Sequence, residues 1–437
     1  MTETALTHRP PRFAVRERLA AVVRSEVALA RIAIGAVALH VADDNFLQPN
    51  PGMSPTDHLG GGLVLLGALV VAGVFYGRVR AGARATIALL AGYFGVLGGI
   101  EAIHYTKEVG PSGDDFTGLV SIPAGLLLIG LAAVTLWRSR RRDGRLWWRY
   151  LRRSLIAAGT VAFAYTVLFS VAFSYVITHA ARAHVPAANL GAPYENVQFT
   201  TSDGLTLKGW YIRSRNGAAV ISFPGRAGSQ SRAKMLADHG YGVLLFDRRG
   251  EGESNGDPNL LGWQGERDIH AAVSFLQLQP DVDLQRIGGI GLSVGGEMMI
   301  EAAAESTALT AIVSEGGSSR SYRDELANGS RFDQVLGIGL FTAASSLFTS
   351  DLPPADLKGL VPKIGNRPVF FIYGEEGQPS EKPANEGFYR AARGPREIWE
   401  VPGSGHMKGI EAQPQEYERR VVGFFDRSLR PIEKETP

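Results

Sequence analysis

Residues 290–296 read Ile290-Gly291-Leu292-Ser293-Val294-Gly295-Gly296 and carry the pattern G-x-S-x-G around Ser293. The small and β-branched residues before the serine predict a strand, and the apolar-faced run after it predicts a helix. On so sharp a strand-to-helix turn the hydroxyl projects clear of the sheet, and side chains at the two flanking glycine positions would collide. With 53 glycines in 437 residues the pattern also arises by chance, so its context decides what it means.

The surrounding chain alternates short β-rich runs with helical runs from about residue 194 onward. This alternation predicts a mostly parallel sheet with helices on both faces, whose chemistry lies in loops at the C-terminal strand ends. Helices are expected at Ser231–His239, Gly265–Leu278 and Val294–Glu305. The expected strands are Val197–Phe199, Leu205–Ile212, Ala218–Phe223, Tyr241–Phe246, Arg286–Leu292, Leu309–Ser314, Pro368–Tyr373 and Arg396–Val401.

A nucleophilic serine needs a general base of near-neutral pKa, which is usually histidine. The C-terminal half offers His239 and His270, which lie in predicted helices, and His406, which follows a strand directly. His406 is therefore the expected base. An oxyanion hole needs backbone N–H groups. We expect Val294 N–H to supply one donor and Arg226 N–H, or alternatively Gly225 N–H, to supply the second.

These residues resemble the α/β-hydrolase superfamily, and in particular bacterial esterases similar to serine aminopeptidase and dienelactone hydrolase. The resemblance covers residues 194–430 and implies an α/β-hydrolase fold with a helical lid at residues 316–365. The matching stretches are Ser202–Leu205, Gly209–Tyr211, Phe223–Gly225, Phe246–Gly256, the run around Ser293, and Val401–His406.

The chain departs from the family pattern at two places. The family usually has histidine before the oxyanion-loop glycine, where this chain has Pro224. The family's triad aspartate falls at Gly377, which cannot serve as the acid. Glu376 is the first candidate for this role, Glu315 at the end of the sixth strand is the alternative, and Glu381 is a third choice. A Ser–His dyad without an acid is also possible.

The N-terminal half is predicted to be a membrane domain, because a span needs about 20 apolar residues. Residues 27–180 hold about five candidate transmembrane helices between a basic tail at 1–26 and a linker at 181–193. The weakest candidate is Val27–Leu47, which contains Arg31, Asp43 and Asp44. The other four are Gly60–Gly77, Ala85–Ile100 with its apolar continuation, Phe116–Trp137 and Ser154–Thr178.

Loop charges predict the orientation, because Lys and Arg concentrate on the cytoplasmic side. The N-terminal tail and the loops at 78–84 and 138–153 are rich in arginine, whereas the loops at 43–59 and 101–115 are not. We therefore expect a multi-pass cell-membrane protein with a cytoplasmic N-terminus and an extracytoplasmic hydrolase domain at 194–430, followed by a tail at 431–437.

Composition excludes some functions. The chain has no cysteine and a net charge of +2, so thiol chemistry is excluded and nucleic acid binding has no electrostatic support. A group of acidic and histidine residues in the N-terminal half could bind a metal ion, but it lacks the compact spacing typical of metal ligands. We therefore expect no metal and no cofactor. The members of that group are His40, Asp43, Asp44, Asp57, His58, Glu101 and His104.

The apolar run Val335–Phe348 within the predicted lid suggests lid packing, an acyl pocket or contact with the outer leaflet. The expected function is that of a membrane-anchored serine hydrolase acting on a small or lipid-like acyl substrate, an ester in preference to a peptide. The alternatives are an acyltransferase or a peptidase on the same residues, and a catalytically weak membrane sensor or scaffold. The lipid bilayer is the expected partner; protein partners are unknown.

Overall fold

The computed structural model describes residues 25–108, 113, 115–139, 145–180, 182 and 184–430. Most of the basic N-terminal tail, the arginines at 140–142 and the tail at 431–437 lie outside the described residues. The chain divides into two compact units. One unit comprises residues up to Pro49 together with His58–Thr160, and the other comprises Asn50–Asp57 together with Val161–Pro437.

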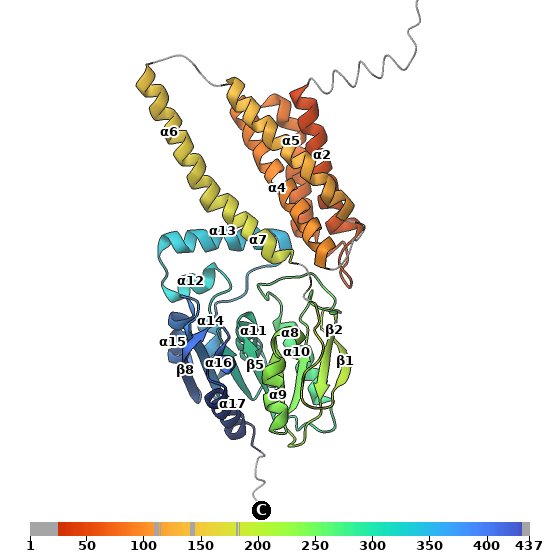
Figure 1. Ribbon diagram of the computed structural model, residues 1–437, viewed down its shortest axis with the longest axis vertical. Helices are drawn as coiled ribbons and strands as arrows, with labels where there is room; N and C mark the ends of the chain where they lie inside the picture. Colours follow the sequence, from red (N-terminus) through yellow and green to blue (C-terminus); the bar gives the residue numbers. More distant parts are fainter. Residues whose placement is uncertain are drawn as a thin grey trace, which may run out of the picture. The chain divides into compact units, whose positions relative to one another are not determined.

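The first unit is built from helices (Figure 1). Its tightest packing joins α4 to α5, where a Cβ atom on Gly92 would lie only 2.6 Å from the Gly125 carbonyl oxygen. Ser121 Oγ donates across the same interface to the Gly95 carbonyl at 2.6 Å. Small residues and buried hydroxyls of this kind are typical of helix packing in lipid. The elements are α2 Glu26–Ala42, η1 Asp43–Leu47, α3 Leu59–Phe75, η2 Tyr76–Arg78, α4 Ala81–Glu108, α5 Asp115–Ser139 and α6 Leu146–Phe163, which crosses into the second unit.

Four helical segments in the described chain are long and apolar enough to cross a membrane, by length and composition. They are Leu59–Arg78, Ala81–Lys107, Phe116–Ser139 and Leu146–Thr178. The weakest of the five predicted spans, Val27–Leu47, is not among them. It forms the 17-residue α2 and then the π-helical η1, so that no single α-helix there reaches a spanning length.

The second unit is built on one eight-stranded sheet in the order β1-β2-β4-β3-β5-β6-β7-β8 (Figure 1). β1 and β2 form an antiparallel hairpin, β2 pairs antiparallel with β4, and the remaining neighbours pair in parallel. All eight predicted strands are present. They are β1 Glu195–Thr200, β2 Thr206–Ile212, β3 Ala219–Phe223, β4 Gly242–Phe246, β5 Ile287–Leu292, β6 Ala311–Glu315, β7 Val369–Glu376 and β8 Arg396–Gly405.

Helices cover both faces of the sheet, as the alternating pattern predicts. Buried side chains form one apolar cluster on each face, one with Phe371 and Phe388 and the other with Phe370 and Phe425. The phenylalanines at 370 and 371 point to opposite faces because successive strand residues alternate. The covering helices are α8 Gly225–Gly228, α9 Gln230–Asp238, α10 Glu266–Gln277, α11 Val294–Glu305, α14 Leu357–Leu360, η4 Val361–Ile364, α15 Glu381–Ala391, α16 Gly409–Ala412 and α17 Pro414–Ser428.

The insertion between β6 and β7 is helical, as expected for residues 316–365. It contains α12 Tyr322–Asn328 and α13 Phe332–Thr349 before α14. The end of the last apolar segment, η3 Ala164–Leu168 and α7 Phe169–Thr178, belongs to the second unit. The division between the two compact units falls before Val161 because α7 packs against α13, while the predicted membrane domain at 27–180 stays a prediction. The predicted linker is packed as well, since Leu190 is buried in the sheet's core.

Candidate active site

Ser293 lies on the sharp turn between β5 and α11. Its backbone has φ 50° and ψ −124°, a left-handed conformation that strains a residue with a side chain. A Cβ atom on Gly291 would lie 2.2 Å from the Gly295 carbonyl oxygen, and one on Gly295 would lie 2.7 Å from Pro224 Cδ. Both glycines of G-x-S-x-G are therefore required by close backbone approach, which confirms the physical reason given for them.

A second serine of the chain fits the same pattern. Ser254 lies between Gly252 and Gly256, but it is fully buried and its hydroxyl donates to the Asp247 carbonyl at 2.6 Å. It follows no strand-to-helix turn of the kind at Ser293. The pattern alone does not identify a nucleophile, whereas the pattern in its structural context distinguishes Ser293.

His406 directly follows β8 and meets Ser293. Its Nε2 lies 2.9 Å from Ser293 Oγ, a hydrogen-bonding distance for a serine and its general base. The other two histidines of the hydrolase domain are engaged elsewhere. His239 Nε2 lies 2.8 Å from Glu418 Oε1, and His270 Nε2 lies 3.2 Å from the Ala302 carbonyl oxygen.

The carboxylate beside His406 belongs to Glu381, which was only the third choice from the sequence. His406 Nδ1 lies 2.6 Å from Glu381 Oε1, and the Gln378 N–H donates to the same oxygen at 2.6 Å. Glu381 is completely buried. With Nδ1 donating to this carboxylate, Nε2 carries the lone pair that can accept the Ser293 proton.

The structure places neither preferred acid against His406. Glu376 is the last residue of β7 and its side chain is exposed to solvent. Its main chain pairs with Gly405 after a register shift that begins at Gly374, and the carboxylate that meets His406 Nδ1 is that of Glu381. Glu381 instead begins α15, and the first turn of that helix aims it back at His406.

Glu315 is buried in a network beneath the histidine loop. Its Oε2 accepts from Arg232 Nη2 at 2.9 Å and from the Tyr417 hydroxyl at 2.6 Å, while its Oε1 accepts from Gly409 N–H at 3.0 Å. Burial alone would lower the pKa of Arg232, but Tyr417 and Glu315 together raise it above its ordinary value. Arg232 also donates to the Met407 carbonyl at 2.7 Å. Glu315 therefore fixes the loop that carries His406 and does not contact the imidazole.

The structure also bears on the predicted oxyanion-hole donors, Arg226 N–H and the alternative Gly225 N–H. Arg226 N–H donates to Asp247 Oδ1 at 2.9 Å, and the Arg226 guanidinium pairs with Asp247 Oδ2 at 2.6 Å and with Glu253 at 2.8 Å. An N–H that is already bonded to a buried carboxylate is not available to an oxyanion, so the preference for Arg226 was wrong. The alternative donor, Gly225 N–H, follows Pro224, which packs against Gly295 of the elbow, and it stays a prediction together with Val294 N–H.

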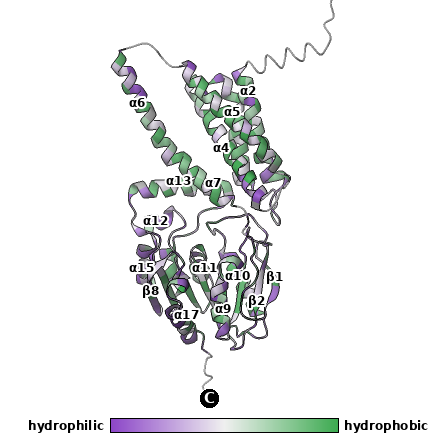
Figure 2. Cartoon of the chain, in the orientation of Figure 1, coloured by the Kyte–Doolittle hydropathy of each residue, from purple (hydrophilic) through white to green (hydrophobic). Residues whose placement is uncertain are grey.

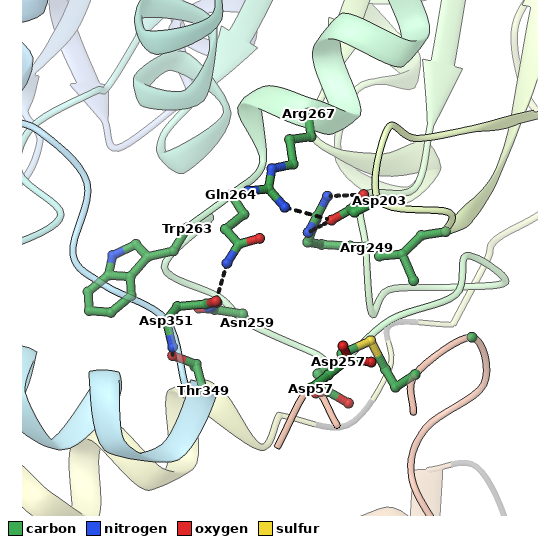
Figure 3. A pocket seen from close by; sticks show the side chains of 13 residues that line it. Asp57, Asp203, Arg249, Asp257, Asn259, Trp263, Gln264, Arg267, Thr349 and Asp351 are labelled. Carbon is green, nitrogen blue, oxygen red and sulfur yellow. Dashed lines mark hydrogen bonds and ion pairs between the residues drawn. The ribbon is translucent and has the colours of Figure 1, made fainter. Parts of the chain in front are cut away.

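A polar cavity of about 300 Å³ lies within the same unit, and Figure 3 shows its lining. Gln264 donates to Asp351 across it. Burial raises the pKa of Asp351 to about 6. Trp263 lines the cavity, and Gly262, which precedes it in the sequence, lies against the elbow. A Cβ atom on Gly262 would lie 2.5 Å from Val294 Cγ2. Ser293 and His406 do not line it.

The acidic and histidine residues of the N-terminal half do not form a metal centre within the described part of the chain. His40 Nδ1 lies 3.3 Å from Thr117 Oγ1, which donates to Asp43 Oδ2 at 2.8 Å. These contacts satisfy the buried histidine and aspartate by hydrogen bonding within the helix bundle, as expected for polar groups there.

Comparison with known proteins supports an enzyme. The family model of the X-Pro dipeptidyl-peptidases (S15 family) matches residues 178–358. A polyketide transferase from a Penicillium species is 32% identical over 181 residues, which cover 39% of this chain and 60% of the transferase. An uncharacterized protein of Escherichia coli K12 is 24% identical over 258 residues, which cover 54% of this chain and 82% of the length of that protein. A solved esterase from Pyrococcus furiosus covers 57% of this chain and 98% of its own, with 24% identity and a TM-score of 0.46.

An eight-stranded, mostly parallel sheet with a strained serine after its fifth strand and a histidine after its last defines a class of hydrolytic enzymes. The C-terminal unit of this chain has the α/β-hydrolase fold, and its match to the family model above supports assignment to the α/β-hydrolase superfamily. The chain spans 60% of the length of the transferase above.

Proposed function

We propose that the protein is a membrane-anchored serine hydrolase that cleaves carboxylic esters through an acyl-enzyme on Ser293. One observation carries this proposal. Ser293 Oγ, both ring nitrogens of His406 and the carboxylate of Glu381 form one hydrogen-bonded chain, with distances of 2.9 and 2.6 Å. This order of nucleophile, base and orienting acid is that of a catalytic triad.

The reaction begins when Ser293 Oγ attacks the ester carbonyl and its proton passes to His406 Nε2. The tetrahedral oxyanion accepts hydrogen bonds from Val294 N–H and Gly225 N–H. Collapse re-forms the carbonyl and breaks the bond to the alkoxy group, which leaves as an alcohol with the proton from His406. Water then attacks the acyl-enzyme, gives a proton to His406, and releases the carboxylic acid as Ser293 regains its hydrogen. Glu381 remains ionised and stabilises the imidazolium in both halves.

Acyl transfer is the second candidate on the same residues. The relatives that favour it are the polyketide transferases from Penicillium and Stachybotrys, at 32% and 31% identity. In that reaction an alcohol replaces water in the second step, and the acid–base roles are unchanged. Adding a series of primary alcohols to the assay distinguishes the two, because a transferase yields a new ester where a hydrolase yields free acid.

The membrane anchoring and orientation are supported by the four apolar helices and by the arginine-rich loops at 78–84 and 138–153. Two spans separate these loops, which directs the final span outward whatever α2 does. A pair of reporters fused after Pro437 tests this orientation. We expect the reporter that works only outside the cytoplasm to be active, and activity of the cytoplasmic reporter would overturn it.

Turnover of a panel of soluble esters by the full-length protein tests the proposed chemistry. Ser293→Ala should reduce kcat by at least about a thousandfold, as loss of a triad nucleophile does. Ser274→Ala, an exposed serine on α10, is the matched control and should leave turnover unchanged. Equal turnover by the two variants would exclude Ser293 as the nucleophile.

A further inference from the structure

The lid helix α13 has an unusual composition for a helix on a water-soluble domain. The segment Gln334–Thr349 is an apolar helix without one charged residue. At its N-terminal end Phe332 is 81% exposed and Leu336 is 44% exposed. Val335, Ile338 and Leu340 are partly exposed as well, and exposed apolar surface gathered on one helix usually marks a site of contact with another apolar phase.

The lid helix packs on the end of a candidate membrane span. Ser174 Oγ of α7 and Ser345 Oγ of α13 lie 2.8 Å apart, and both are buried. Two aromatic pairs flank this contact. The rings of Phe173 and Phe341 lie 5.5 Å apart, and those of Tyr175 and Phe348 lie 5.2 Å apart. Small hydroxyl residues between apolar helices are how helices associate in lipid.

An aromatic ladder runs along α7 and its preceding turn toward the lid. The rings of Tyr165, Phe169 and Phe173 follow one another at 6.3 and 6.0 Å, and Phe341 of α13 continues the ladder. Exposure falls along it from 78% at Tyr165 through 61% and 49% to 7% at Phe341. The ladder thus leads from open apolar surface into the packed lid.

The continuity of α7 with the span identifies what covers this surface. Leu146–Thr178 is one helical segment that meets the length and hydropathy of a membrane span, and α7 is its C-terminal end. Figure 2 shows the same apolar character in α13 and in α7. In the proposed topology α7 ends the last span, so the buried contacts that hold α13 against α7 bring α13 to the level where headgroups meet acyl chains.

We propose that α7 and α13 form a lipid-facing lid, and that the substrate is a long-chain acyl ester taken from the bilayer along the aromatic ladder. This inference rests on the serine hydrolase chemistry proposed above and names its substrate class. The apolar lid helix, uncharged from Gln334 to Thr349, keeps the acyl chain out of water once the chain has left the lipid, so the transfer does not expose its CH₂ groups. The ester carbonyl then meets Ser293.

Site-directed fluorescence tests the lipid contact. The chain has no cysteine, so Leu336→Cys can be labelled alone with a polarity-sensitive dye in lipid nanodiscs. The matched control is Leu278→Cys, an 81% exposed leucine at the end of α10. Spin-labelled lipids should quench the dye at position 336 by at least about half, and most strongly when the spin label lies near the headgroup, since interfacial helices lie about 5–10 Å deep. Quenching no greater than at position 278 would overturn the lipid contact, as would protection of the dye by a second copy of the chain.

Kinetics test the substrate class. For Phe169→Ser we expect the kcat/KM for a long-chain ester presented in vesicles, divided by that for a soluble short-chain ester, to fall about tenfold, because the acyl chain loses its apolar contact with one exposed aromatic side chain of the ladder. Leu278→Ser should leave this ratio unchanged. If the wild-type protein turns over neither ester, the proposed hydrolase function fails. If it turns over the short ester and the ratio is the same in all three proteins, only the lipid substrate is overturned.

Discussion

A Cβ atom on Gly377 would lie 2.6 Å from Glu381 Oε2 and 2.8 Å from Glu381 Cδ. The glycine at the position where related enzymes carry their acid therefore makes room for a carboxylate that comes from the first turn of α15. In the proposed triad the acid is Glu381, four residues after this glycine, and the absence of a side chain at Gly377 leaves the space that its carboxylate occupies. His406 still meets a buried carboxylate on its Nδ1 side.

Glu381→Gln should lower kcat by about a hundredfold to ten-thousandfold. An amide at this position can present its NH₂ group to Nδ1, which favours the wrong imidazole tautomer and leaves the imidazolium unstabilised. Glu376→Gln, whose side chain is exposed on the same segment, is the matched control and should retain full turnover. Steady-state kinetics on a soluble ester measure both, and a larger loss in Glu376→Gln would return the acid role to that residue.

The relocation of the acid also predicts a rescue. Glu381→Ala should be nearly inactive, and Gly377→Asp alone should suffer from the close contact described above. The double variant places a carboxylate in the vacated space, so we expect it to exceed Glu381→Ala in kcat by about tenfold or more. Additive losses in the double variant would show that the two positions do not share one space.

Glu315→Gln should act on stability more than on chemistry. It leaves the buried Arg232 guanidinium without its countercharge, which costs about 3 kcal/mol or more in buried pairs. We expect a clearly lower midpoint of thermal unfolding in detergent. Glu416, which is partly exposed and pairs with Arg419 and Arg420 on the surface, provides the control, and Glu416→Gln should leave the midpoint unchanged. A normal melting temperature for Glu315→Gln with loss of turnover would assign Glu315 a direct catalytic part.

Asp351 predicts a pH dependence of stability. Burial raises its pKa from 3.8 to about 6 in the folded protein, so the folded state binds more protons than the unfolded state between these values. The stability that the protonated Asp351 contributes, relative to ionised Asp351, is therefore fully present below about pH 4 and is lost as the pH rises through 6. Asp351→Asn should remove this loss, raising stability at pH 7 by about 1–3 kcal/mol. Thermal unfolding from pH 4 to 7 measures it, and parallel curves for variant and wild type would contradict the shift.

Much of the fold was predictable because its determinants are local. The strand-to-helix turn at Ser293 and the placement of His406 after a strand follow from patterns that neighbouring residues carry themselves. The alternating runs likewise predict the parallel sheet, since each strand and helix shows its own periodicity. The four strongest apolar runs could be read from hydropathy, but Val27–Leu47 could not be resolved in this way because its helix is short and carries charges.

The remaining features depend on contacts between distant residues. Glu381 precedes His406 by 25 positions, and nothing local distinguishes it from Glu376 except its place at the start of a helix after Gly377. The Arg226 N–H donates to Asp247, 21 positions away in the sequence, and so is not free to bind an oxyanion. The assignment of α7 to the hydrolase unit rests on contacts such as that between Ser174 and Ser345, which hydropathy does not report.

The most direct measurement of the proposed mechanism is covalent labelling of the folded, full-length protein with a fluorophosphonate probe, followed by peptide mapping. We predict a single modified site at Ser293, no labelling of Ser293→Ala, and labelling of Glu381→Gln slowed by about a hundredfold or more, because the base then lacks its orienting carboxylate. Modification of another serine, or labelling of Ser293 that is equally fast in wild type and Glu381→Gln, would contradict the triad of Ser293, His406 and Glu381.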